Sequence, residues 1–353
     1  MDSCNSKKCG LECIKFCPVN KEDSDCIVLG DNGKAIISES LCTGCGICIQ
    51  KCPFDAITIL NLAEELLEKR MHQYGINTFR LYNLPTLRRG NVIGLVGRNG
   101  VGKSTALNIL SGNLKPNFGD YSSPPDWDEI IDYFKGTEYK DHFSKISSNT
   151  LQVSVKPQAV YSLSNVWKGD TLSLLKHYDE RNVIDTMIQE LDLEQTLNRK
   201  VSELSGGELQ RVAVAVSASR EADLYLFDEP SSYNDIYQRL NVSNVIQKLA
   251  SDDRSVIIVE HDLTLLDYLC DFVQILYGDQ GAYGIVSSVQ SSRKGINTLL
   301  DGYLPTENVR FRDTPISFAV YAPIGDESTS IELLNYSNTV SYTHLTLPTN
   351  REV

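Results

Sequence analysis

Residues 91–110 read NVIGLVGRNGVGKSTALNIL, and this stretch decides the fold of most of the chain. An apolar segment of strand character leads into a glycine-rich loop, and the residues after the loop have helical spacing. This is the setting of a P-loop, in which backbone N–H groups surround nucleotide phosphates. Lys103 is expected to reach the β- and γ-phosphates, and Ser104 to offer its hydroxyl to Mg²⁺. The residues predicted to bind nucleotide here are Gly97, Asn99, Gly100, Gly102, Lys103, Ser104 and Thr105.

Two further apolar segments end in polar residues that suit nucleotide chemistry. Residues 223–230 read DLYLFDEP, which predicts a buried strand followed by two carboxylates. Asp228 fits the role of anchoring Mg²⁺, and Glu229 fits that of orienting or deprotonating an attacking water. Residues 255–260 predict another buried strand, and His261 follows it directly. Ligands bind at the carboxyl ends of strands in α/β sheets, so His261 is expected at the same site.

The segment LSGGELQR, residues 204–211, opens a helix rich in alanine and valine that is predicted from Glu208 to about Ser219. Ser205, Gly206 and Gly207 would place a helix N-terminus and a hydroxyl group where a phosphate can dock. The alternative is an ordinary capped helix with no ligand.

The P-loop, LSGGELQR, LYLFDEP and His261 occur in an order that resembles an ABC nucleotide-binding domain. The resemblance implies an ATPase in which the LSGGE segment, up to Glu208, faces the nucleotide held by an opposite domain. It also implies that Gln158, in the segment KPQ, is the Q-loop residue and that His261 is the switch histidine. Glu229, His261 and Gln158 are therefore the predicted catalytic residues.

An aromatic side chain is expected to stack on the adenine ring. Tyr74 and Phe79 are the two candidates, and burial in the core would explain either of them equally well.

Nine of the ten cysteines lie within the first 52 residues, which indicates a separate cysteine-rich domain. Residues 42–53 read CTGCGICIQKCP, which is similar to the cysteine run of bacterial ferredoxins. A looser run of four cysteines ends at Cys17, before Pro18. The fourth cysteine of a ferredoxin run ligates the other cluster, so crossed ligation of two 4Fe-4S clusters is predicted. The expected ligands are Cys4, Cys9, Cys13 and Cys52 for one cluster and Cys17, Cys42, Cys45 and Cys48 for the other.

Zinc is the alternative metal, because CxxC pairs also form tetrahedral zinc sites. Eight cysteines in two runs that each end in Cys-Pro favour iron–sulfur chemistry. Cys26 is left over, and its expected role is that of a small buried apolar residue.

The composition limits the class of protein. The 33 basic and 46 acidic residues give a net charge of −13, which opposes binding of bare nucleic acid over a broad face. No apolar run is long enough to span a membrane, and the start MDSCNSKKC lacks the apolar core of a signal peptide. A cytoplasmic protein without membrane contact is expected.

Several phrases beyond the generic motifs resemble the ribosome-recycling ATPases of ABC subfamily E, the RNase L inhibitor family. They are PPDW (residues 124–127), DEPSSY (228–233), VEHDL (259–263) and GYLPTENVRFRD (302–313). The resemblance implies splitting of ribosomes into subunits after termination or rescue, driven by ATP-dependent closure of two nucleotide domains. It implies as partners the small ribosomal subunit, with its rRNA and protein, and a release or rescue factor. The clusters would be structural levers rather than electron carriers.

The expected architecture is an α+β ferredoxin-like two-cluster domain at residues 1–60, followed by an α/β P-loop ABC domain at 61–300. A helix–loop–helix insertion is predicted at 124–149, because Asp126 and Glu129 form a capping-box pattern and apolar residues recur with helical spacing. The family rests this insertion on the small subunit, and packing within the domain is the alternative. Residues 301–318 resemble the family's hinge.

The family carries two nucleotide-binding domains, whereas this chain has one P-loop, so a second domain is expected to be missing. Residues 319–353 are predicted to be a stub of that domain or a non-native tail. Asn234 stands where the family usually has an apolar residue. Two rival functions are an ATP-gated iron–sulfur electron carrier and an ABC subunit of a transporter or cluster-assembly system.

Overall fold

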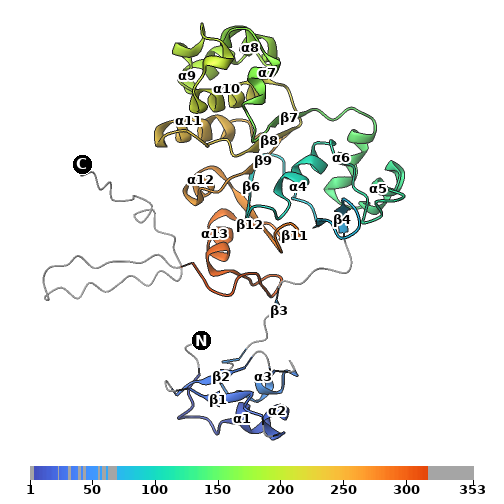
Figure 1. The fold of residues 1–353 in the computed structure, drawn as a ribbon, viewed down its shortest axis with the longest axis vertical. Helices are drawn as coiled ribbons and strands as arrows, with labels where there is room; N and C mark the ends of the chain where they lie inside the picture. Colours follow the sequence, from blue (N-terminus) through green and yellow to red (C-terminus); the bar gives the residue numbers. More distant parts are fainter. Residues whose placement is uncertain are drawn as a thin grey trace, which may run out of the picture. The chain divides into compact units, whose positions relative to one another are not determined.

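The computed structural model describes residues 4–22, 24–30, 33–38, 41–42, 45–54, 56–57, 61–62 and 70–316. The chain divides into two compact units, residues 1–62 with 308–310 and residues 63–307 with 311–353 (Figure 1). The tail predicted from residue 319 lies outside the described residues. None of the helices in the described ranges has the length and apolar character needed to cross a membrane.

The smaller unit is built from short elements around its cysteines. Their bounds are α1 Glu12–Phe16, α2 Pro18–Lys21, β1 Ile27–Leu29, β2 Ala35–Ile37, α3 Ile47–Lys51, β3 Asn61–Leu62 and β14 Val309–Arg310. Strands β1 and β2 pair antiparallel, and β3 and β14 pair parallel. Cys13, Cys17, Cys26 and Ile27 form its buried core, so thiols occupy positions that aliphatic side chains hold in larger domains.

The larger unit contains a mixed sheet, which has nine strands within residues 70–316 and the order β4-β5-β11-β10-β6-β9-β8-β7, with β12 beside β10. Strands β10, β6, β9, β8 and β7 run parallel. Strand β11 is antiparallel to β10 and parallel to β5, and β4 is antiparallel to β5. The strand bounds are β4 Arg70–Gln73, β5 Arg80–Tyr82, β6 Val92–Gly97, β7 Val153–Lys156, β8 Leu224–Asp228, β9 Ser255–Val259, β10 Phe272–Tyr277, β11 Tyr283–Val286 and β12 Gln290–Ser291, followed by β13 Tyr303–Leu304 outside this sheet.

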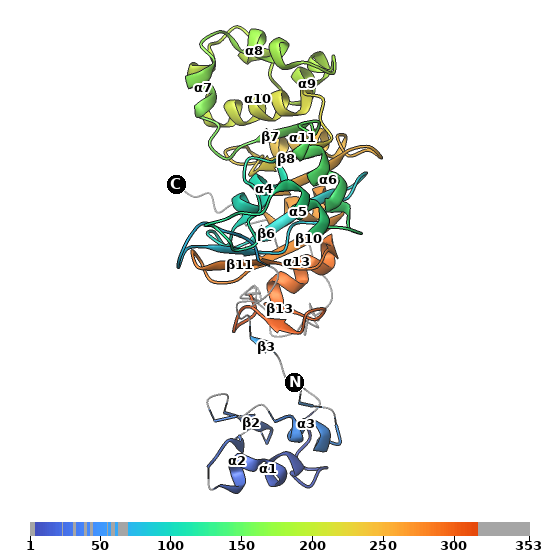
Figure 2. The same ribbon diagram turned by 90° about the vertical axis from the view of Figure 1, so that its right-hand side faces the viewer.

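Helices cover this sheet, and α10 lies between the sheet and helices α7 to α9 in both views (Figures 1 and 2). The central strands β6, β8 and β9 are almost entirely buried, as expected for aliphatic parallel strands with both faces covered. The helix bounds are α4 Lys103–Leu110, α5 Trp127–Tyr133, α6 Glu138–Ser147, α7 Ser162–Val166, α8 Thr171–Tyr178, α9 Ile184–Glu190, α10 Gly206–Ser219, α11 Ile236–Gln247, α12 Leu263–Leu269 and α13 Ser292–Asp301, with 3₁₀ turns at Glu194–Thr196 and Val201–Glu203.

The predicted helix–loop–helix is confirmed as α5 and α6. Asp126 accepts the Glu129 N–H at 2.9 Å, and the Glu129 carboxylate accepts the Asp126 N–H at 3.3 Å, which completes the predicted capping box. The rings of Phe134 and Phe143 stack 5.0 Å apart, and both are buried with the core of the larger unit. The apolar face of the insertion therefore packs inward, and its polar face is left for solvent.

Helix α6 also carries a buried histidine. His142 Nε2 donates to the carbonyl oxygen of Leu110 at 2.8 Å, at the end of α4, where helix carbonyls lack partners within the helix. Burial lowers the pKa of His142 from its ordinary value of 6.5, against a smaller opposite effect of this hydrogen bond.

Acidification below pH 6.5 is expected to destabilise the larger unit through His142. The unfolded chain, with a histidine pKa near 6.5, binds a proton that the folded chain does not, so the free energy of unfolding falls as the pH falls. One such group contributes a limiting slope of about 1.4 kcal/mol per pH unit. Denaturant unfolding followed by tryptophan fluorescence tests this, because Trp127 lies beside Phe143. His142→Gln should flatten the slope between pH 6.5 and 5.5, and an unchanged slope would contradict the assignment.

Candidate active site

The loops after the parallel strands surround a cleft of about 460 Å³ at their carboxyl ends. Every predicted nucleotide-binding residue except Gly97 lines it. The lining residues are Tyr74, Phe79, Asn99, Gly100, Gly102, Lys103, Ser104, Thr105, Gln158, Asp228, Glu229 and Gly281.

Three glycines in and before the loop are required, two for the backbone conformation of the loop and one for strand pairing. Gly100 and Gly102 have φ of +76° and +95°, in the left-handed region that side chains disfavour. A Cβ atom on Gly102 would also lie 2.6 Å from the Phe79 ring. Gly97 ends strand β6, and a Cβ atom there would lie 2.2 Å from the Leu276 carbonyl oxygen in β10. Gly97 therefore permits strand pairing, whereas the other two shape the loop.

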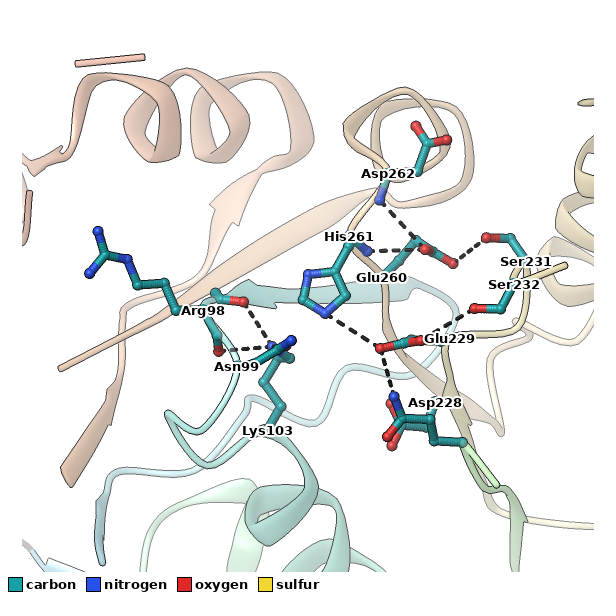
Figure 3. Close-up of polar contacts among 12 residues, drawn as sticks. Arg98, Asn99, Lys103, Asp228, Glu229, Ser231, Ser232, Glu260, His261 and Asp262 are labelled. Carbon is teal, nitrogen blue, oxygen red and sulfur yellow. Dashed lines mark hydrogen bonds and ion pairs between the residues drawn. The ribbon is translucent and has the colours of Figure 1, made fainter. Parts of the chain in front are cut away.

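The ammonium group of Lys103 lies inside the loop. It donates to the carbonyl oxygens of Gly97 and Arg98 at 2.8 and 2.9 Å and to the Asn99 side chain at 3.3 Å (Figure 3). Burial lowers the pKa of Lys103, while the carboxylates of Asp228 and Glu229 oppose the shift. The loop thus holds a cation among neutral oxygens, beside two acids and facing the cleft.

Glu229 is the centre of a network at the end of β8 (Figure 3). Its Oε1 accepts from Gln158 Nε2 at 3.0 Å and lies 3.5 Å from His261 Nε2, and its Oε2 accepts from the Ser232 hydroxyl at 3.2 Å. All three predicted catalytic residues therefore meet at one carboxylate. Burial and the charge of Lys103 lower the pKa of His261, so its imidazole is neutral at pH 7. Burial raises the pKa of Asp228, and the charge of Glu229 raises it further.

The two aromatic candidates differ in their surroundings. Phe79 packs against the buried core and Gly102. Tyr74 is 52% exposed, and its hydroxyl lies 3.2 Å from Thr105 Oγ1 in helix α4. Both rings line the cleft, and Tyr74 is the more exposed of the two.

The residues of the LSGGE segment lie apart from this cleft. Ser205 to Glu208 line a second cleft of about 430 Å³ with Arg211, Tyr233 and Gln238, and the two clefts share no lining residue. Ser205 caps α10 and accepts from Glu208 N–H, while Glu208 Oε2 accepts from Ser205 N–H at 2.8 Å. Helix α10 thus begins at Gly206, two residues earlier than predicted, because Glu208 is the third helical residue of a capping box.

The unusual Asn234 is buried, with 4% of its surface exposed, next to this second cleft. Its side-chain oxygen accepts from Arg211 at 3.2 Å, and its backbone oxygen accepts from Arg239 at 2.8 Å. A polar link therefore joins the start of α10 to the segment after Glu229, where an apolar residue was expected.

Two residues around the main cleft, Gly281 and Glu260, were not predicted as part of the site from the sequence. Gly281, after β10, donates its N–H to the Gly100 carbonyl oxygen at 3.0 Å and so closes the loop from the other side. Buried Glu260 accepts from the Ser231 hydroxyl at 2.7 Å and from the N–H of His261 at 3.0 Å (Figure 3). No local pattern marks these two residues, since Gly281 bonds to Gly100 after β6 and Glu260 bonds to Ser231 after β8.

Cysteines of the two runs interact across the smaller unit. Burial raises the pKa of Cys13, and the charges of Cys9, Cys4 and Cys52 raise it further, so Cys52 lies within electrostatic reach of the first run. Cys17 is the residue that caps the C-terminus of α1, and Cys52 has the same place after α3. The two helices contact each other.

The second predicted set is Cys17, Cys42, Cys45 and Cys48, and Cys26 lies near two of its members. Burial raises the pKa of Cys48, with further contributions from the charges of Cys42 and Cys45. The pKa of Cys26 is raised to about 11, mainly by burial. Contact with Cys17 and the charge of Cys42 raise it further. In the described ranges no three Cys, His or acidic side chains stand close enough to hold a metal ion as placed. Thiols are the side chains that ligate iron–sulfur clusters, so the residue types suit the predicted metal.

Three protein families match parts of the chain. Residues 84–232 match the ABC transporter family, residues 35–58 match the 4Fe-4S binding domain, and residues 1–24 match the possible Fer4-like domain in RNase L inhibitor. The predicted order of an iron–sulfur domain and an ABC domain is thereby confirmed.

Curated relatives extend the match to nearly the whole chain. ABC transporter E family member 1 of Arabidopsis thaliana is 50% identical over 320 residues, which are 90% of this chain and 53% of that protein. The chain thus spans about half the length of the first relatives that it matches. A putative ABC transporter ATP-binding protein of Pyrococcus abyssi is 32% identical over 193 residues, 53% of this chain and 70% of that protein.

Two solved structures share the fold at high identity. One is described as ribosome-bound archaeal Pelota and ABCE1, with a TM-score of 0.69, 48% identity, and coverage of 90% of this chain and 54% of that chain. The other is the complex of the archaeal ribosomal stalk protein aP1 with the archaeal ribosome recycling factor aABCE1. Its TM-score is 0.70 at 45% identity, and it covers 75% of this chain and 51% of that chain.

Proposed function

Because the chain belongs to the ABC family of ATP-binding proteins, and to its RNase L inhibitor branch, we propose that it binds and hydrolyses Mg-ATP in the main cleft. The convergence of Gln158, His261 and Ser232 on the Glu229 carboxylate carries this proposal. A carboxylate held from three sides faces the P-loop lysine across one cleft, which suits a group that orients an attacking water.

Each side chain then has a role that its position supports. Lys103 exchanges its loop carbonyl partners for the β- and γ-phosphates, and the N–H groups of residues 100–105 surround them. Asp228 and Ser104 would hold Mg²⁺, which supplies charge neutralisation when bound. Glu229 takes up the proton of the attacking water or orients it, while neutral His261 donates to the γ-phosphate as ADP leaves. Tyr74 stacks on adenine.

A complete site requires two domains. The LSGGE cleft shares no residue with the P-loop cleft, so Ser205, Gly206 and Gly207 are free to face a nucleotide held elsewhere. We assign that nucleotide to a second nucleotide-binding domain, which the one P-loop of this chain does not supply. Glu208 keeps the start of α10 rigid through its capping box.

The smaller unit would hold two 4Fe-4S clusters, one on Cys4, Cys9, Cys13 and Cys52 and the other on Cys17, Cys42, Cys45 and Cys48. When bound, such clusters cross-link the two runs covalently. A unit with so small an apolar core gains its stability from such links. Their role here is mechanical rigidity.

The process that ATP drives is the splitting of ribosomes in the cytoplasm. The two similar solved structures concern a ribosome-bound protein and a ribosome recycling factor, and that function carries over to this chain as a proposal. The partners would be the small ribosomal subunit and a release or rescue factor. Residues 1–60 form the iron–sulfur domain, 61–300 the ABC domain, 301–318 the hinge, and 319–353 a stub or non-native tail in this plan.

Charge reversal on the solvent side of the insertion should weaken ribosome binding. Lys140 of α6 is exposed, whereas Lys145 forms an ion pair with Asp223 at 2.9 Å. Lys140→Glu therefore changes the surface charge without breaking that ion pair. We expect co-sedimentation with small subunits to fall several-fold and to become less salt-dependent, since one phosphate contact is lost.

The matched control for this variant is Lys176→Glu, which makes the same charge change at an exposed position of α8. ATP affinity should be unchanged in both variants. Equal loss of co-sedimentation in both would indicate a general charge effect and remove the insertion from the interface.

A further inference from the structure

A second lysine lies beneath the active-site turn. Lys156, the last residue of β7, is completely buried, and its ammonium group donates to the carbonyl oxygen of Asp228 at 2.7 Å and to that of Glu229 at 3.0 Å. It lies within electrostatic reach of Asp228, Glu260 and Glu229. The main cleft does not include Lys156 among its lining residues, so this amine faces the protein backbone rather than a ligand.

Burying the charged ammonium group of Lys156 has a cost in free energy that must be compensated. Removing an ammonium group from water is unfavourable unless hydrogen bonds and opposite charges compensate, and an apolar side chain fills the same space at lower cost. Burial lowers the pKa of Lys156 to about 8, against the nearby carboxylates, so the group remains mostly charged at pH 7.

The two accepting carbonyls belong to a strained piece of backbone. Glu229 has φ of +48°, a left-handed conformation that non-glycine residues rarely adopt and that persists only where the surroundings hold it. Its N–H donates to the Val259 carbonyl oxygen at 2.9 Å, which fixes one side of the residue. Lys156 fixes the carbonyl groups on both sides of the Glu229 Cα atom.

The same segment also holds the side chain. Gln158, two residues after Lys156, donates to Glu229 Oε1 at 3.0 Å. The end of β7 therefore restrains both the backbone and the carboxylate of Glu229, although more than 70 residues separate them in sequence.

We propose that Lys156 is a positioning residue that holds the Asp228–Glu229 turn in the geometry that ATP hydrolysis requires. This inference rests on the proposed function, because it assigns Lys156 to the same site. Lys156 does not line the cleft, and it acts through the backbone of Asp228 and Glu229.

The first test is steady-state kinetics of the full chain. Lys156→Met removes the donors at similar length, and Lys156→Gln keeps a shorter neutral donor. Misplacing a catalytic group by about 1 Å costs roughly a hundredfold in rate. We therefore expect kcat to fall about a hundredfold for Met and less for Gln, with KM changed by less than about threefold. Lys168→Met, at an exposed lysine outside the cleft, is the control and should keep the parent kinetics.

The second test reads the turn without hydrolysis. Labelling aspartate carbonyl carbons with ¹³C and glutamate nitrogens with ¹⁵N selects Asp-Glu pairs, of which the sequence has four, at residues 128–129, 179–180, 228–229 and 326–327. The signal that Glu229→Gln removes is that of Glu229. It should shift in Lys156→Met while residues 128–129 and 179–180 keep theirs, and Lys168→Met should shift none.

The outcomes separate the two ideas. A shifted Glu229 signal with no hydrolysis by the parent chain would support the positioning role and reject the proposed ATPase activity. An unshifted signal, or a KM that rises in step with the loss of kcat, would overturn the role of Lys156. If Lys156→Met does not fold, Lys156→Gln is judged by the same two measurements.

Discussion

Glu229→Gln is expected to lower kcat for ATP by about a hundredfold to a thousandfold while ATP affinity stays within about threefold of the parent. Glutamine keeps the size of the side chain and the hydrogen bond from Ser232, but it loses the negative charge that draws Gln158 and attracts the proton of water. Binding depends on Lys103 and the loop N–H groups, which the substitution leaves in place. Nucleotide affinity and turnover should be measured on the same preparation.

The parent chain itself is expected to hydrolyse ATP slowly, at a rate per chain that rises with protein concentration. The P-loop cleft and the LSGGE cleft lie in different places, so two chains must pair head to tail before one site contains both. Glu229→Gln should trap such pairs, since it blocks the step that releases them. Light scattering with and without ATP measures the trapped dimer.

Glu194→Gln provides the matched control for Glu229→Gln, because it makes the same change at an exposed residue. It should behave as the parent in turnover and in light scattering. Rapid turnover that is independent of concentration, together with a Glu229→Gln variant that stays monomeric, would show that one domain suffices.

Cys52→Ser should remove a whole cluster, and that cluster should be the one held by the first cysteine run. Two 4Fe-4S clusters contain eight irons, so anaerobically purified protein should fall from about eight irons to about four. Crossed ligation gives this result, and the charge of Cys52 acts on Cys13 of the first run. Iron and sulfide analysis with absorption near 400 nm measures the loss, and stoichiometric zinc without sulfide would reject the clusters altogether.

Pairs of substitutions decide whether the ligation is crossed. Cys9→Ser combined with Cys52→Ser should lose no more iron than either alone, because both act on one cluster. Cys45→Ser combined with Cys52→Ser should lose nearly all iron, because two clusters are affected. The reverse pattern would place Cys52 with its own run. Cys270→Ser, at a buried cysteine of the larger unit, should lose none.

The sequence predicted the parts of the site that depend on short-range chemistry. Gly100 and Gly102 adopt the left-handed backbone that a P-loop needs, and Lys103 lies within the loop that its spacing implied. The capping box of Asp126 and Glu129 was readable because its two hydrogen bonds span three residues. The capping pattern of Ser205 and Glu208 is equally local, and it sets the start of α10 at Gly206 rather than at the predicted Glu208.

The sequence by itself therefore determined the P-loop, the two acids at the end of β8, the LSGGE segment that opens α10, and two cysteine runs, because each is a pattern within a short stretch of residues. Only the tertiary structure decided that both Tyr74 and Phe79 border the cleft, with Tyr74 the more exposed ring, and that the insertion packs its aromatic face inward. It alone decided that Lys156 reaches the Glu229 turn. Strand order brings β7 beside β8 although they lie about 70 residues apart, and the hydrogen bonds made there leave no repeating pattern along the chain.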